Sequence, residues 1–262
     1  MNLGFCLIVF VFGACIGSFL NCLIYRLALP SFSKKNLGGL KSRSFCPKCL
    51  HQLAFFDLIP VLSFIFLKGK CRYCGQKISW QYPLVEIATG GLFLLIFLRF
   101  TIYYLPFTIY LFVVSSLLII IFVYDLKHYI IPDKIIYPAI AVVFLYKIIF
   151  NFQTSNLYSS ILSALVVSGF FFLLWLVSHG KWMGLGDAKL AFLMGLFLGS
   201  PNILSALFLA FLIGAIIGLG LVALGKKNLK SQVPFGPFLV VGTFIALFWG
   251  KEIIKWYLNL VT

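Results

Sequence analysis

Long apolar segments are the feature that most constrains how this 262-residue chain can fold. Hydrophobic residues make up 62% of it and charged residues 10%, against roughly 25% charged in soluble domains. A helix needs roughly 20 apolar residues to cross a bilayer. We expect eight such spans, near residues 3–25, 83–99, 105–124, 134–150, 158–178, 187–200, 203–224 and 234–258. The chain is therefore predicted to be an all-α, polytopic integral membrane protein.

The expected span at 187–200 is the weakest of these, because Gly195, Gly199 and Pro201 interrupt it early. Short or broken segments persist at membrane depth only where protein or a water-filled cavity surrounds them. We therefore expect a membrane active site near this segment.

The net charge of +15 is distributed unevenly along the expected topology. Of the 21 basic residues, 17 fall on one face of the eight-span arrangement, ten of them between Arg26 and Lys77. The positive-inside rule makes this face cytoplasmic and places both termini outside. Arg26 follows the first apolar run instead of preceding it, so we expect this run to be a span and not a signal peptide. The basic charge thus indicates topology and argues against a nucleic-acid partner.

Four of the seven cysteines form two closely spaced pairs, separated by 21 residues. Two Cys-x2-Cys turns can deliver four thiolates in the tetrahedral arrangement that structural zinc prefers. Disulfides are rare in the reducing cytoplasm, where the topology places these turns. The pattern favours a zinc site over disulfides or free thiols, with the ligands Cys46, Cys49, Cys71 and Cys74.

The apolar segment 53–67 lies between the two cysteine pairs and contains Asp57 and Pro60. If one metal holds all four cysteines, both ends of this segment lie on the same side of the membrane. It then cannot span, and we expect an interfacial segment in contact with the lipid bilayer.

Two of the six acidic residues, Asp125 and Asp187, stand at the ends of apolar segments. Ionisable groups at membrane depth are costly and usually mark a functional site. Two carboxylates that share one site do not both ionise readily, so one can activate water while the other polarises a carbonyl group. Each aspartate alone could simply cap a helix. Together, and with no HExxH or GxSxG motif in the chain, they indicate an aspartic acid/base pair.

The glycines of Gly184-Leu185-Gly186, just before Asp187, are expected to let a peptide backbone approach closely, because they carry no Cβ. Asp133 follows Ile131-Pro132 and is expected to cap the next helix.

Five motifs, spread over almost the whole chain, resemble those of bacterial type IV prepilin peptidases, also called prepilin leader peptidases/N-methyltransferases. The motifs are GSFLNCLIYRL (17–27), the cysteine region 45–86, YDLKHYIIPD (124–133), GLGDAKL (184–190) and PFGPFL (234–239). The resemblance implies a membrane aspartic peptidase of the Gly-x-Gly-Asp type, with Asp125 and Asp187 as catalytic dyad. It also implies that the four paired cysteines form the family's tetra-cysteine site.

The resemblance further implies that the enzyme cleaves leaders from prepilins or pseudopilins at the cytoplasmic face of a bacterial inner membrane. Bifunctional members of the family also methylate the new N-terminus with S-adenosylmethionine. The sequence holds no Gly-rich nucleotide loop of the usual kind, and the residues that we expect to contact this cofactor are Gly69, Lys70 and Arg72. The expected organisation is a first span (1–25), a cysteine domain (26–82) and a peptidase core (83–262).

Four other interpretations stay open. One is a member of this family that is a peptidase only, without methyltransferase activity, and another is a presenilin-like intramembrane protease of other substrates. The aspartates of a transporter could relay protons, but we find no matching inverted repeats. A zinc-stabilised scaffold would have no catalytic activity, and substitution of either aspartate would then cause no loss of catalysis.

Overall fold

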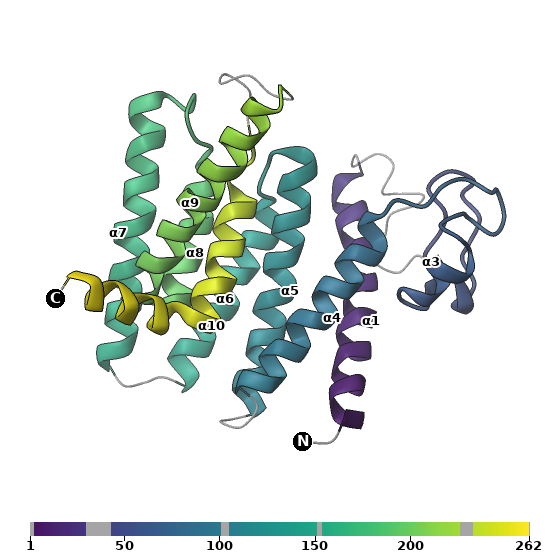
Figure 1. Ribbon diagram of the computed structural model, residues 1–262, viewed down its shortest axis with the longest axis horizontal. Coiled ribbons are helices and arrows are strands. Elements are labelled where there is room, and N and C mark those ends of the chain that lie inside the picture. Colours follow the sequence, from purple (N-terminus) through teal and green to yellow (C-terminus); the bar gives the residue numbers. More distant parts are fainter. Residues whose placement is uncertain (1–2, 30–42, 101–104, 151–153, 226–232, 262) are drawn as a thin grey trace. The chain divides into compact units, whose positions relative to one another are not determined.

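The computed structural model describes residues 3–29, 43–100, 105–150, 154–225 and 233–261. Within these ranges the chain is helical, with two isolated β-bridges in the cysteine region and no longer strand (Figure 1). Six of the basic residues on which the expected topology depends lie outside the described ranges: Lys34, Lys35, Lys41, Lys226, Lys227 and Lys230.

A helix occurs at each of the eight expected spans. They are α1 (Leu3–Ala28), α4 (Gln81–Phe100), α5 (Leu105–His128), α6 (Asp133–Phe150), α7 (Thr154–Ser178), α8 (Leu185–Leu198), α9 (Asn202–Ala223) and α10 (Gly236–Val261). Two short elements lie in the cysteine region, the 3-10 helix η1 (Phe55–Leu58) and α3 (Leu62–Phe66).

The expected number of eight spanning helices is not confirmed. Of the helices in the described ranges, six are long and apolar enough to cross a membrane, and α6 and α8 are not among them. Helix α6 has 18 residues and carries Asp133, Lys134 and Lys147. Helix α8 has 14 residues, which gives about 21 Å of length, against a hydrocarbon core of about 30 Å. The six apolar helices make the chain a multi-pass membrane protein.

The chain divides into two compact units, Met1–Ile120 and Ile121–Thr262. In the first unit α1 packs along α4, and glycines allow the two backbones to approach closely. A Cβ on Gly13 would lie 2.9 Å from the Cα of Gly90, and a Cβ on Gly17 would lie 2.8 Å from the Cα of Glu86. The cysteine region belongs to this unit.

In the second unit the short helix α8 contacts four others, α6, α7, α9 and α10. More than half of its residues are buried: Ala188, Leu190, Ala191, Leu193, Met194, Gly195, Leu196 and Phe197. Gly195 lies against α7, since a Cβ there would be 2.5 Å from the Cα of Ala164. A helix too short to span is therefore surrounded by protein, the condition under which such a segment is tolerated at depth.

An aromatic cluster fixes the start of α10 in the same unit. The ring of Phe235, directly before the helix, lies 5.0 Å from the ring of Phe211 in α9 and 6.1 Å from that of Phe171 in α7. Gly236 and Pro237 then begin the helix, where the missing N–H of proline costs no hydrogen bond.

Candidate active site and metal centre

The structure brings Asp125 and Asp187 close enough for their carboxylates to interact electrostatically. Asp125 lies in the last turn of α5 and is 4% exposed. Asp187 lies in the first turn of α8 and is half-buried. Helix α5 ends three residues after Asp125, at His128. The N–H of Tyr129, which has a positive φ of 57°, donates to the Asp125 carbonyl oxygen and closes the helix.

Each carboxylate accepts a hydrogen bond from the backbone amide of a glycine. The Gly184 N–H donates to Oδ2 of Asp187 at 3.2 Å, across the first turn of α8. The Gly236 N–H, at the start of α10, donates to the Asp125 carboxylate. The first N–H groups of a helix have no partner within the helix and favour negative charge. Two helix N-termini therefore orient the two acids.

The Ile131 side chain lies against the starts of both α8 and α10. A Cβ on Gly186 would be 3.1 Å from Cβ of Ile131, and a Cβ on Gly236 would be 3.5 Å from its Cδ1. Ile131 is 7% exposed. The space beside Gly186 is thus occupied by Ile131, which differs from our expectation that this glycine is kept open for a substrate backbone.

Asp133 is the first residue of α6, and its carboxylate joins this helix to α8. Nζ of Lys189 donates to Oδ1 of Asp133 at 2.6 Å and lies 5.1 Å from the centroid of the Tyr137 ring. The pair connects the first residue of α6 to a residue of α8 that lies two positions after Asp187.

Sequence reasoning did not single out Gly236 or Ile131 as site residues. Their motifs were visible as PFGPFL and YIIPD, but neither residue carries a reactive group. A usable signal was the Gly-Pro pair at the start of an apolar helix. Proline favours the beginning of a helix, and glycine allows another group to approach the backbone closely.

The four paired cysteines form a second cluster in the first unit. Their Sγ atoms all lie within 4.8 Å of one another, and those of Cys46 and Cys74 are 4.0 Å apart. Four sulfurs around one zinc at about 2.3 Å are about 3.8 Å apart, so small shifts would complete the tetrahedron. The cluster can hold a metal ion.

The two Cys-x2-Cys turns have the same backbone structure. The N–H of the first cysteine donates to the carbonyl of the fifth residue after it, at 3.0 Å for Cys46 and 2.8 Å for Cys71. The N–H of the fourth residue donates back to the cysteine carbonyl at 2.9 Å in both turns. This fourth residue has a positive φ, 59° for Leu50 and 68° for Gly75. The sequence spacing therefore produces two equivalent loops that face one another.

The environment of Cys74 opposes ionisation of its thiol. A hydrogen bond from the Gln76 backbone lowers the pKa of the Cys74 thiol, but desolvation and the other three cysteines outweigh it and raise that pKa to about 11. A cation bound among the four sulfurs would compensate the negative charge of the thiolates that ligate it, which is the situation in a structural metal site. The donor set is all sulfur and fits zinc.

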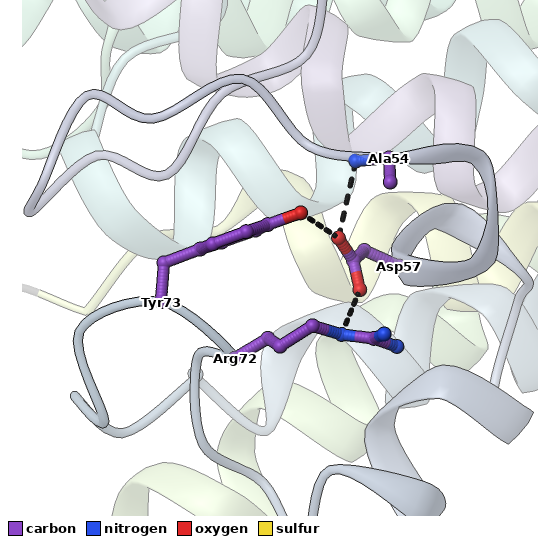
Figure 2. Close-up of polar contacts among 4 residues, drawn as sticks. All are labelled: Ala54, Asp57, Arg72 and Tyr73. Atoms are coloured by element: carbon purple, nitrogen blue, oxygen red, sulfur yellow. Dashed lines mark hydrogen bonds and ion pairs between the residues drawn. The ribbon is translucent and has the colours of Figure 1, made fainter.

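The three residues expected to contact a methyl donor lie beside this cluster. Gly69 has a φ of 68°, and its carbonyl accepts from the Ile78 N–H at 2.8 Å. Lys70 is exposed and lies in an isolated bridge with Lys77. Nε of Arg72 forms an ion pair with Oδ1 of Asp57 at 2.9 Å (Figure 2). The structure thus brings the three together in one loop, and part of Arg72 is already engaged.

The fold and the first site define a class: a multi-pass helical membrane protein in which two helix ends bring a pair of carboxylates together, as an acid/base hydrolase requires. Comparison with known families makes this specific. Residues 11–100 match the bacterial peptidase A24 N-terminal domain, and residues 112–219 match the type IV leader peptidase family. The chain belongs to the type IV leader peptidase family.

Curated relatives align with nearly the whole chain. A prepilin leader peptidase/N-methyltransferase of Bacillus subtilis is 35% identical over 97% of this chain and 98% of its own length. Proteins of the same name from Legionella pneumophila and Aeromonas salmonicida are 32% and 30% identical, each over 97% of this chain and 94% of their own length. No solved structure matches this chain.

Proposed function

We propose that this protein is a membrane aspartic endopeptidase that removes the leader from type IV prepilins or pseudopilins. The observation that carries the proposal is the close approach of Asp125 and Asp187 in a chain that aligns end to end with prepilin leader peptidases. Asp125 and Asp187 act as one unit that shares a proton. The ionised carboxylate takes a proton from a water molecule while the oxygen of that water attacks the scissile carbonyl carbon. The protonated carboxyl group donates its proton to the carbonyl oxygen.

The tetrahedral intermediate then collapses. Its C–N bond breaks, the leaving amine takes up a proton, and the released products are the leader and a pilin with a free N-terminal amine. The Gly184 and Gly236 amides hold the two carboxylates in place throughout this sequence, so little reorganisation is needed. Ile131 lies against both Gly186 and Gly236 and so occupies the space beside these two helix starts.

The same protein N-methylates the new amine, as the names of its relatives state for those proteins. S-adenosylmethionine, when bound, would supply the methyl group: the amine nitrogen attacks the methyl carbon, the bond from that carbon to the sulfonium sulfur breaks to release S-adenosylhomocysteine, and the nitrogen loses a proton. We assign this step to the cysteine domain (26–82), with Gly69, Lys70 and Arg72 as contacts, and assign hydrolysis to the helices of residues 83–262. The presenilin-like alternative is less favoured, because the N-terminal domain match covers the cysteine region.

We place the protein in the bacterial cytoplasmic (inner) membrane, with the dyad opening toward the cytoplasm and both termini outside. The support is the excess of basic residues on one face of the expected topology, 17 of 21. A prepilin presents its cleavage site beside an apolar helix inserted in the same membrane, so enzyme and substrate meet within one bilayer.

The function can be tested with purified enzyme in detergent and a prepilin that carries a Gly-Phe junction. We expect the intact mass of the product to show loss of the leader, and with S-adenosylmethionine a further increase of one methyl group. Cleavage without the methyl increment would make the protein a peptidase only. Absence of cleavage, from a preparation with the expected helix content by circular dichroism, would overturn the proposal.

We further propose zinc as the metal held by Cys46, Cys49, Cys71 and Cys74. Purified protein is expected to contain about one zinc per chain, because a four-cysteine site is complete with one tetrahedral ion. Cys71→Ser should lose it, whereas Cys15→Ser, at an exposed cysteine of α1 outside the cluster, should retain it. Elemental analysis by mass spectrometry measures both. Equal zinc in the two variants would contradict the assignment.

A further inference from the structure

The segment between the two cysteine turns exposes large apolar side chains. We call this set the aromatic patch; its members are 52–81% exposed, and they are Phe55, Phe56, Leu62, Ile65 and Phe66. They lie on η1 and α3, which have four and five residues and are too short to span a bilayer. Several large apolar groups exposed within 12 residues mark an interaction surface.

A hydrogen bond fixes the position of this segment along the axis of α4. The Val61 N–H, directly before α3, donates to Oε2 of Glu86 at 2.8 Å. Glu86 is 6% exposed and lies five residues after the start of α4, which is about 7.5 Å along the helix axis. Interfacial helices bury their apolar face about 5–10 Å deep, at the boundary between headgroups and acyl chains. Relative to the start of α4, the patch is therefore held at about the depth that interfacial helices occupy.

The surroundings of the patch are strongly basic. Residues 43–80 contain six basic side chains and one acidic side chain, a net charge of +5. The acid is Asp57, which is already paired with Arg72. The basic side chains are exposed, and they are Arg43, Lys48, Lys68, Lys70, Arg72 and Lys77. Exposed apolar groups within a basic surface match an anionic lipid leaflet, which attracts basic segments beside membrane helices.

Asp57 connects the patch to the metal centre. Its side chain is 3% exposed, and Oδ2 accepts from the Ala54 N–H and the Tyr73 hydroxyl, each at 3.1 Å (Figure 2). Arg72 and Tyr73 occupy the two positions between Cys71 and Cys74. Because η1 begins at Phe55, one residue after Ala54, the second cysteine turn directly sets the orientation of Phe55 and Phe56.

We propose that the aromatic patch is a lipid-docking surface that holds the cysteine domain on the anionic leaflet in which α1 and α4 are embedded. The patch enters the boundary between headgroups and acyl chains, the basic side chains without another assigned role contact lipid phosphates (Arg43, Lys48, Lys68 and Lys77), and Asp57 couples this orientation to the second cysteine turn. None of the five side chains of the aromatic patch is among the residues assigned to peptide hydrolysis or methyl transfer, so the proposal stands apart from both activities.

Photocrosslinking in the full-length protein tests the occupant of the patch. A benzophenone amino acid is placed at Phe56 or Phe66, or at the exposed Gln76 outside the patch, and the protein is reconstituted into nanodiscs of mixed anionic and zwitterionic lipid. Mass spectrometry of the adducts is expected to find lipid at both patch positions, several-fold more than at Gln76, because only the patch enters the bilayer. Zinc content equal to the unlabelled protein verifies that each variant is folded.

The other occupants give different adducts. Crosslinks at Phe56 and Phe66 to a second copy of this chain, or to prepilin only when it is added, would overturn the proposal, as would equal lipid adducts at Gln76. The readout does not depend on cleavage, so a failure of the proposed enzymatic function would leave this result interpretable.

A charge-reversal pair tests the lipid preference. With the label at Phe66, the ratio of anionic to zwitterionic adducts should fall about threefold or more in Lys68→Glu/Lys77→Glu, because basic side chains attract anionic headgroups. The matched control, Lys251→Glu/Lys255→Glu, makes the same charge change in α10 and should leave the ratio unchanged. An unchanged ratio in both pairs would show that charge does not select the lipid and would overturn this part of the proposal.

Discussion

Asp125→Asn and Asp187→Asn are each expected to lower the rate of leader cleavage by at least about a hundredfold, since acid/base groups typically contribute that much or more. An asparagine fills nearly the same volume but cannot take a proton from water or donate one to a carbonyl oxygen. The two acids form one unit, so the double variant should be hardly slower than either single variant. Intact-mass analysis of the prepilin product over time measures the rates.

Two controls separate loss of chemistry from loss of fold. Glu252→Gln neutralises a carboxylate in α10 away from the first turn of that helix and should cleave at the wild-type rate. Both aspartate variants should still methylate a pilin that has already been cleaved, because methyl transfer is assigned to the cysteine domain. Cleavage at the wild-type rate by either Asp125→Asn or Asp187→Asn would refute the dyad.

Gly236→Ala is expected to reduce cleavage by about a hundredfold, the loss that a displacement of about 1 Å can cause in a catalytic group. A Cβ at this position would lie 2.5 Å from Oδ2 and 3.2 Å from Cγ of Asp125. The carboxylate would have to move away, and its hydrogen bond from the Gly236 N–H would lengthen or break. The same cleavage assay measures the effect.

The matched control for this variant is Gly218→Ala in α9, where an added Cβ has no neighbour within 4 Å. It should have wild-type activity and, through the helix propensity of alanine, equal or higher stability. Thermal unfolding in detergent should show Gly236→Ala to be folded. Full activity of Gly236→Ala would mean that the Asp125 carboxylate tolerates displacement and that its contact with α10 does not matter for cleavage.

The positions of the membrane helices were largely predictable, because each apolar run must satisfy its own backbone hydrogen bonds. The expected span at 203–224 corresponds to α9 (Asn202–Ala223), and that at 105–124 to α5 (Leu105–His128). The count of spanning helices was less predictable. Helix α8 is apolar, but its short length is acceptable because other helices surround it, and a neighbour cannot be read from the run itself.

The polar residues also show which features were predictable from the sequence and which were not. Asp57 and Glu86 have unremarkable positions in the sequence, in an apolar loop and near a helix start. In the structure each is buried and accepts hydrogen bonds from a distant part of the cysteine domain, Asp57 from Tyr73 and Glu86 from Val61. A buried carboxylate needs such partners, but only the folded chain identifies them.

By itself the sequence determined the helical membrane class and the two Cys-x2-Cys turns, and it singled out two aspartates as candidates for an acid/base pair. Each of these depends on a local property of the chain: the length of apolar runs, the spacing of cysteines and the rarity of acidic residues. The tertiary structure decided how the aspartates are held. It placed the Gly236 amide on Asp125 and Ile131 against Gly186, contacts between residues that are about 110 and 55 positions apart. Such contacts depend on which helices pack together, and helix packing depends on the shape of whole surfaces and not on any single motif.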